Sequence, residues 1–169
     1  MSARESEAII LAKSVPLLDR QGDALCSVGV TPKGEWLRLY QKPPALTAFA
    51  RWTHIKFRRH ASAIDSRPES CDVEPNSIRI IGELPPSRRH DLLSLLETHR
   101  LEDARRQGKS LALLHPSESH FCMEQKTKAE LAEEERQSAH PCPYRFKYRY
   151  TTESSEGEAV FHDWGLDNN

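Results

Sequence analysis

No stretch of this sequence approaches the ~18 consecutive apolar residues that a membrane-spanning helix needs, so such a helix is excluded. The start of the chain carries two acids, Glu5 and Glu7, where a signal peptide would carry bases. The apolar run at residues 8–12 is also too short for the core of a signal peptide. We therefore expect a cytoplasmic protein that has no membrane partner.

Cysteine is scarce, and its spacing excludes several kinds of site. Cys26, Cys71, Cys122 and Cys142 are widely separated and form no Cys-x-x-Cys pair, so we expect reduced thiols. The sequence also lacks a Gly-rich phosphate loop and a serine nucleophile elbow. These absences leave enzymatic activity open and favour a protein without one.

The chain is large enough to bury a core of its own. It has 169 residues, of which 37% are hydrophobic and 29% charged, and its mean hydropathy is -0.68. These values are typical of a polar globular protein rather than a disordered one. With no repeat and no linker visible, we expect a single domain over residues 1–169.

Net charge hides a segregation of charged residues along the sequence. The net charge of -1 argues against indiscriminate binding to polyanions. However, residues 54–60 and 144–150 each hold three bases and no acid, whereas residues 151–169 hold five acids and no lysine or arginine. A local basic surface is therefore compatible with the balanced total.

Short strands dominate the first half of the chain. Alternating or apolar runs predict strands at 7–12, 25–30, 35–40, 54–59 and 77–82. The second and third flank Thr31-Pro32-Lys33-Gly34, which predicts a β-hairpin turn. We expect residues 62–76 to form a loop.

Two helices and further strands are predicted in the second half. A leucine-rich helix is expected from Ser87 to about Gln107, and a capping box at residues 127–130 opens another. Strands are expected at 109–114 and 121–125, with a C-terminal β-hairpin at about 144–164. The sequence thus predicts an α+β fold, with a curled, mostly antiparallel sheet or small partly closed β-barrel and two main helices.

Several short motifs resemble those of an uncharacterised prokaryotic protein family with no established activity. They are GEWLRLY at 34–40, DSRPES at 65–70, KSLAL at 109–113, YRFKYRY at 144–150 and Asp163-Trp164. The family pattern would have a proline after Tyr40, where this chain has Gln41. In size and element mix the chain also resembles the small β-barrels of the PUA and ASCH kind. Neither resemblance implies particular site residues.

The segment YRFKYRY alternates aromatic and cationic residues, so an extended chain would separate four rings from three bases. Similar alternation at 36–40 and 54–58 would expose further bases and rings on outward strand faces. Such a surface can stack bases and neutralise phosphates. The predicted nucleic-acid-binding residues are Trp36, Arg38, Tyr40, Lys56, Arg58, Arg145, Lys147 and Arg149.

Plainer interpretations compete with this one. The solvated face of an antiparallel sheet is usually charged, and the rings at 144–150 would also suit a core, above all Phe146 and Tyr148. Alternatively, the acidic strand at 158–163 pairs with the basic one, so that acids and bases neutralise each other across the hairpin. That arrangement would remove a binding groove.

Two patterns suggest metal or nuclease chemistry. His120, Cys122, His140 and Cys142 form two His-x-Cys pairs, a candidate zinc site with a spacing unusual for zinc. Glu124 and Lys126 end a predicted strand, as in metal-dependent nucleases, but the upstream acids Asp91 and Asp103 lie on a predicted helix. We expect no cofactor, with zinc as the exception to test.

Taken together, these patterns favour a non-catalytic module that recognises nucleic acid or a nucleotide through a basic, aromatic-bearing sheet face. The alternative is a protein-interaction subunit of a larger complex, with a protein as its partner. A metal-dependent nuclease ranks third.

Overall fold

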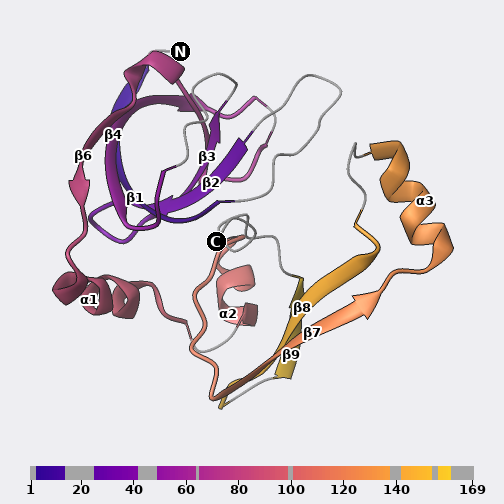
Figure 1. Cartoon of the computed structure of the whole chain (residues 1–169). Helices are drawn as coiled ribbons and strands as arrows, with labels where there is room; N and C mark the ends of the chain where they lie inside the picture. Colours follow the sequence, from indigo (N-terminus) through magenta and orange to yellow (C-terminus); the bar gives the residue numbers. More distant parts are fainter. Residues whose placement is uncertain are drawn as a thin grey trace.

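A small β-barrel and a separate three-stranded sheet form the two ends of the protein in a computed structural model (Figure 1). The structure describes residues 3–13, 25–41, 49–63, 65–98, 101–137, 142–153 and 156–160. No helix in these ranges is long and apolar enough to cross a membrane.

Five strands close the barrel in the order β1-β2-β3-β5-β4, because β4 pairs with β1 as well as with β5. A sixth strand, β6, pairs with β4 outside this ring. All pairings are antiparallel except that of β3 with β5. The strands are β1 (Arg4–Lys13), β2 (Leu25–Val30), β3 (Trp36–Gln41), β4 (Thr53–Ala61), β5 (Ser70–Val73) and β6 (Arg79–Glu83).

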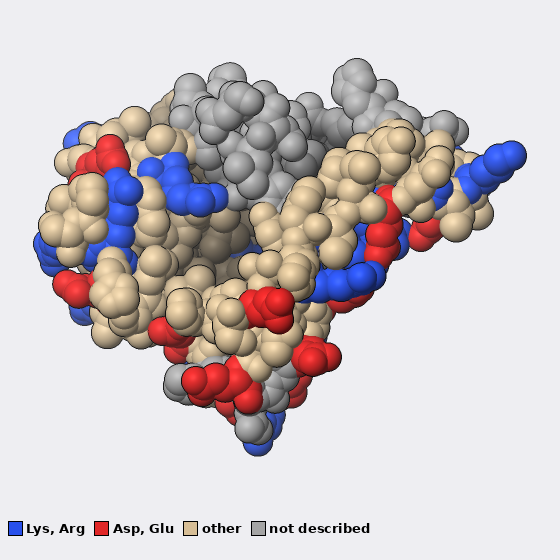
Figure 2. All heavy atoms as spheres, turned by 60° about the horizontal axis from the view of Figure 1, so that its bottom comes forward, with Lys and Arg blue, Asp and Glu red and all other residues tan. Residues whose placement is uncertain are grey.

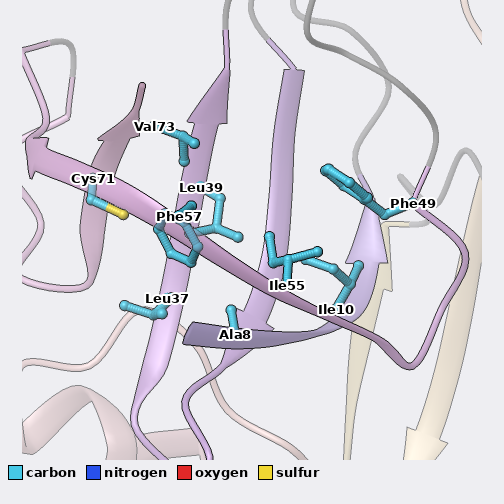
Figure 3. Close-up of a cluster of buried hydrophobic side chains, with 9 residues drawn as sticks. All are labelled: Ala8, Ile10, Leu37, Leu39, Phe49, Ile55, Phe57, Cys71 and Val73. Atoms are coloured by element: carbon cyan, nitrogen blue, oxygen red, sulfur yellow. The ribbon is translucent and has the colours of Figure 1, made fainter. Parts of the chain in front are cut away.

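Alternate side chains of these strands fill the barrel (Figure 3). Leu37 and Leu39 of β3 and Ile55 and Phe57 of β4 are at most 2% exposed, as the alternation of the sequence predicts. The other members of this inner core are Ala8, Ile10, Phe49, Cys71 and Val73.

Helix α1 (Pro86–Leu96) covers the outside of the barrel wall. Its Leu92 and Leu96 form a second buried cluster with Ile9 of β1 and Val30 of β2. The middle of β1 is apolar on both faces, since Ile9 faces this cluster while Ala8 and Ile10 face the barrel interior.

The expected long helix from Ser87 to Gln107 is in fact two helices. After α1, Glu97 adopts an extended conformation and pairs with Leu113, and α2 (Leu101–Arg106) follows. Within the predicted strand at 109–114, the pairing is limited to this bridge at Leu113. The break between the two helices is a tertiary effect, because it coincides with a bridge between Glu97 and Leu113, which are distant in the sequence.

The second sheet has the order β7-β8-β9, with α3 inserted between its first two strands. Thr127 and Glu130 form the predicted capping box: the Glu130 N–H donates to Thr127 Oγ1, and the Thr127 N–H donates to Glu130 Oε2. The bounds are β7 (Glu118–Gln125), α3 (Lys128–Gln137), β8 (Tyr144–Thr151) and β9 (Glu156–Val160).

The α+β class, the small barrel and the pairing of the terminal hairpin are confirmed. The barrel is fully closed rather than partly closed, and the strand that completes the ring, β5, lies inside the expected loop at 62–76. The remainder of the predicted hairpin, from residue 161 to 164, lies outside the described residues.

Candidate functional site

Arg38 and Tyr40 lie on the outer wall of the barrel, as predicted, but both are engaged within the protein. Arg38 Nε lies 3.7 Å from a carboxylate oxygen of Glu69 and donates to Ser110 Oγ at 3.2 Å. Tyr40 is only 8% exposed, and its hydroxyl donates to Asp65 at 2.8 Å. The third predicted residue of this strand, Trp36, packs against the cluster beneath α1.

A polar network around Asp65 joins two of the sequence motifs. Asp65 accepts hydrogen bonds from Arg67 and Ser70 as well as from Tyr40. The Arg67 guanidinium holds the pKa of the Asp65 carboxyl well below its usual range. Burial, together with the hydrogen bond to Asp65, raises the pKa of Tyr40 to about 12. The network therefore fastens the segment before β5 to the barrel wall.

Lys56 and Arg58, the predicted bases of β4, also have acidic partners. Lys56 Nζ lies 3.2 Å from Glu5, and Arg58 Nε lies 3.0 Å from Glu74. Both pairs are on the outer surface, where ion pairs contribute little to stability. These bases could exchange their partners for a ligand, but they do not form an uncompensated positive patch.

The three bases of β8 face acids on both neighbouring elements. Lys147 lies 2.7 Å from Glu124 of β7 and 3.2 Å from Glu158 of β9, and Arg149 contacts the same two acids. Arg145 pairs with Glu130 of α3 at 2.7 Å. In Figure 2 this side of the molecule shows adjoining basic and acidic groups. The expected alternative, an acidic strand that neutralises the basic one, is what the structure has.

An open hollow lies where the barrel mouth meets the α1–α2 region. Its volume is about 520 Å³, and its walls include Trp36 of β3, Leu96 of α1 and Lys109. A second hollow of about 340 Å³ adjoins it and is lined by Arg4, Lys33 and Lys56, among others. Glu35 and Arg59 line both hollows, so they stand at the boundary between them.

Arg59 reaches this boundary because of the register of β4. Ile55, Phe57 and Arg59 share the inward face of the strand, and the third of these lies where the barrel opens. Among the described residues, no carboxylate lies within ion-pair distance of Arg59. Its guanidinium is near the Cys71 thiol. Burial raises the pKa of this thiol, and the Arg59 cation offsets only part of the rise.

Three more bases at the hollows, Arg4, Lys33 and Lys109, likewise have no ion-pair partner in the part of the chain that the structure describes. Acids are present too. Glu69 is paired with Arg38, and Glu97 lies 3.9 Å from His115, whereas Glu35 has no basic partner among the described residues. The mouth of the barrel is therefore mixed in charge, with its uncompensated bases around Arg59.

Residues 4–96 match a protein family described as a domain of unknown function, DUF8758. The chain belongs to this family. The match spans the barrel and α1, the elements that build most of the two hollows. No curated protein and no solved structure matches the DUF8758 chain.

Arg59 was missing from the predicted site because the strand at 54–59 was interpreted by its outward residues. The signal was present, however: strict alternation from Ile55 through Phe57 places residue 59 on the inward face. Lys33 and Lys109 could not be grouped with it, since they come from separate segments that meet only in the folded DUF8758 chain.

The candidate zinc ligands are only partly described. His120 Nε2 lies 2.9 Å from a carboxylate oxygen of Glu118, and Cys122 is on the same strand. Cys142 is half-buried, and His140 lies outside the described residues. In the described ranges, no three His, Cys, Asp or Glu side chains come together as a metal site would require.

The candidate nuclease residues have separate partners. Glu124 pairs with Lys147 and Arg149 on one face of the second sheet, whereas Lys126 pairs with Glu134 of α3. Asp103, one of the upstream acids, pairs with Arg106 of α2. This geometry does not bring the proposed acids and lysine around a common point.

Proposed function

We propose that this DUF8758 protein is a non-catalytic recognition module that binds a nucleotide or nucleic acid at the mouth of its barrel. The observation that carries the proposal is Arg59, a base on the inward face of β4 that lines both hollows and has no acidic partner among the described residues. A half-buried guanidinium of this kind is well suited to a phosphate group.

The size and lining of the larger hollow support a ligand of nucleotide size. Its volume of about 520 Å³ falls within the ~300–1,000 Å³ typical of small-molecule sites. Trp36 and Leu96 provide apolar walls suited to a base, while Arg59 and Lys109 are suited to phosphate oxygens. The small closed barrel also supports the likeness to PUA and ASCH barrels, which we retain as part of the proposal.

The balance of charge favours a ligand with few phosphates. Glu35 and Glu97 line the larger hollow beside its bases, so a long duplex would bring phosphates close to carboxylates. A mononucleotide, or the end of a single strand, needs only the bases around Arg59. We therefore place the site at the barrel mouth, where Lys56 lines the second hollow, instead of on the outer base Arg58.

A pair of adjacent substitutions tests this placement. Arg59→Met removes the inward guanidinium, and Arg58→Met removes the neighbouring outward one, with the same change in net charge. A charge-assisted hydrogen bond contributes roughly 1.5–3 kcal/mol, so Arg59→Met should weaken binding by about 10- to 100-fold. Arg58→Met should leave the affinity within about twofold of wild type.

Calorimetric titration with the common mononucleotides and with short single-stranded DNA and RNA, at two salt concentrations, provides the measurement. Arg59→Lys retains a positive charge and should recover part of the affinity. Binding that survives Arg59→Met, or that Arg58→Met weakens equally, would place the ligand elsewhere. If wild-type protein binds none of these ligands at about 1 mM, a concentration that detects even weak sites, the proposed function is wrong.

A further inference from the structure

Two arginines lie side by side on neighbouring strands at the mouth of the barrel. In the antiparallel pairing of β1 with β4, Arg4 is directly opposite Arg59, and Ala8 is directly opposite Ile55. Ala8 and Ile55 are buried in the barrel core, and residues four positions apart on a strand share its face. Arg4 and Arg59 therefore both point to the inward side of the wall, where both line the second hollow.

This pairing brings two positive charges close together. Side chains that are directly opposite in an antiparallel pair have Cβ atoms about 4.5–5.5 Å apart, so both guanidinium groups can contact one small anion. Like charges in such positions destabilise a sheet, and a negative group between them would relieve the repulsion. An anion that binds at this point is therefore favoured by both arginines.

Among the described residues, no acid compensates the arginine pair. Glu5 and Glu7 also line the second hollow, but they alternate with Arg4 onto the other face of β1 and pair there with side chains of β4. Glu35 lines the hollow too, yet it makes no ion pair with either arginine. The Cys71 thiol near the pair stays protonated at neutral pH, because burial raises its pKa.

Another pair of opposed bases shows how the protein compensates such charge elsewhere. Lys56 of β4 is opposite Arg79 of β6 on the outer face of the wall, and Glu5 lies 3.2 Å from Lys56. Arg79 is also exposed to water. The outer bases are thus balanced by an acid and by hydration, whereas the inward pair has no acidic partner in the described part of the chain.

We propose that Arg4 and Arg59 together bind the terminal phosphate of the ligand in the second hollow, an inference that rests on the proposed function. Guanidinium groups suit this role because each can donate two parallel hydrogen bonds to phosphate oxygens. Lys33, on the turn between β2 and β3, lines the same hollow and adds a base from another element.

The linings of the two hollows give the ligand a direction. Of the described residues along the second hollow, only Pro32 is apolar. The larger hollow is lined by Trp36, Leu95 and Leu96, and the Leu95 side chain is 71% exposed. Apolar walls suit a base better than a phosphate, so the base lies in the larger hollow and the phosphate lies beyond Arg59.

A pair of guanidinium groups favours a phosphate monoester over the phosphodiester inside a strand. A monoester carries a charge of about −1.5 to −2 at pH 7 and three acceptor oxygens that can face both arginines. A phosphodiester carries a single charge, and one of its sides is occupied by the next nucleotide. The ligand class is therefore a nucleoside with a terminal phosphate, either a free mononucleotide or the phosphorylated end of a strand.

Arg4→Met tests the arginine pair, and Arg79→Met is the matched control. Arg4 is exposed near the start of β1, so its substitution should leave the fold intact. Arg79 is equally exposed but lines neither hollow, and its loss changes the net charge by the same amount. The probes for calorimetric titration are the common 5′-mononucleotides, their nucleosides, and short oligothymidylate and oligouridylate with or without a 5′-phosphate. Inorganic phosphate is added in separate thermal unfolding experiments.

We expect wild type to bind mononucleotides at least about tenfold more tightly than nucleosides, and Arg4→Met to lose about tenfold in affinity for every phosphorylated probe. Its nucleoside affinity should stay within about twofold of wild type. Arg4→Lys should recover part of the loss, and Arg79→Met should bind like wild type. Inorganic phosphate should raise the melting temperature of wild type and Arg79→Met more than that of Arg4→Met.

Phosphorylated probes that bind Arg4→Met and wild type equally well would overturn the inference. Equal losses in Arg4→Met and Arg79→Met, or equal binding of oligonucleotides with and without the phosphate, would also overturn it. If Arg59→Met alone weakens mononucleotide binding, the proposed function stands and the arginine pair does not. If no nucleotide binds but inorganic phosphate stabilises the protein through Arg4, the pair is supported as a phosphate site and the proposed function is wrong.

Discussion

Asp65 illustrates how single residues of the sequence motifs at 34–40, 65–70 and 109–113 act mainly by holding the fold together. Its carboxylate accepts from Arg67 at 2.7 Å, Ser70 at 2.6 Å and Tyr40 at 2.8 Å. Ser110 and Arg38, from two other motifs, meet beside Glu69. The motifs at 34–40, 65–70 and 109–113 are therefore joined by side-chain contacts on the outer side of the barrel wall.

Tyr40 makes this network sensitive to alkaline pH. Burial and the Asp65 carboxylate raise its pKa to about 12, so folding favours the neutral phenol. The resulting stability is complete below the ordinary tyrosine pKa of about 10 and is lost as pH rises from there through about 12. Urea unfolding across this range should show a shallower alkaline decline for Tyr40→Phe than for wild type. Tyr144→Phe, which removes an exposed hydroxyl, is the control, and equal declines in all three proteins would contradict the prediction.

At the scale of single elements, α3 depends on its cap. The helix has ten residues, too few to be stable alone in water, and the Thr127–Glu130 capping box satisfies N–H groups at its start. The hydrogen bond from the Thr127 N–H, followed by those from the Arg145 guanidinium and the Thr127 hydroxyl, lowers the pKa of the Glu130 carboxyl to about 2. The cap is therefore fully ionised at neutral pH and would weaken only as pH falls below the usual glutamate range.

Thr127→Ala should destabilise α3 by about 1 kcal/mol, the typical loss for a missing cap. Hydrogen exchange of the amides at 131–137 should accelerate about fivefold, while exchange in the barrel strands stays the same. Lys128→Ala, an exposed substitution at the next residue, should change neither. Equal acceleration throughout the chain would mean that α3 unfolds only together with the barrel.

Local signals predicted the elements that form locally. The turn before Gly34, whose φ is +83°, and the capping box at Thr127 both depend on residues a few positions apart. In contrast, β5 is a strand of only four residues that owes its existence to β3 and β4, and the break after Leu96 depends on the bridge to Leu113. The position of Arg59 depends on both local and distant residues. Its inward direction follows from the alternation along β4, whereas its place in a hollow follows from closure of the barrel.

At the scale of the whole molecule, the barrel and the second sheet act as distinct units. The family match ends at residue 96, the last residue of α1, so the shared part of the DUF8758 chain includes the barrel and its covering helix. Beyond it, Ala104 of α2 and residues including Glu97, Lys109 and Ala112 complete the larger hollow. The three-stranded sheet makes only sparse contacts with the barrel among the described residues. Ligand binding at the barrel mouth can therefore be tested without the second sheet.

A fragment of residues 1–116 should fold and bind without the second sheet. It retains both buried clusters, including Leu113, and every residue that lines the two hollows. We expect nucleotide affinity within about twofold of the full chain and a urea m-value reduced in proportion to the smaller surface exposed on unfolding. Calorimetry and urea unfolding on the two proteins provide these comparisons. A fragment of residues 1–98, which lacks Lys109 and the bridge at Leu113, is the matched control and should lose affinity. An unfolded 1–116 fragment would show that the barrel requires the second sheet, because its own two cores would then be insufficient to stabilise it.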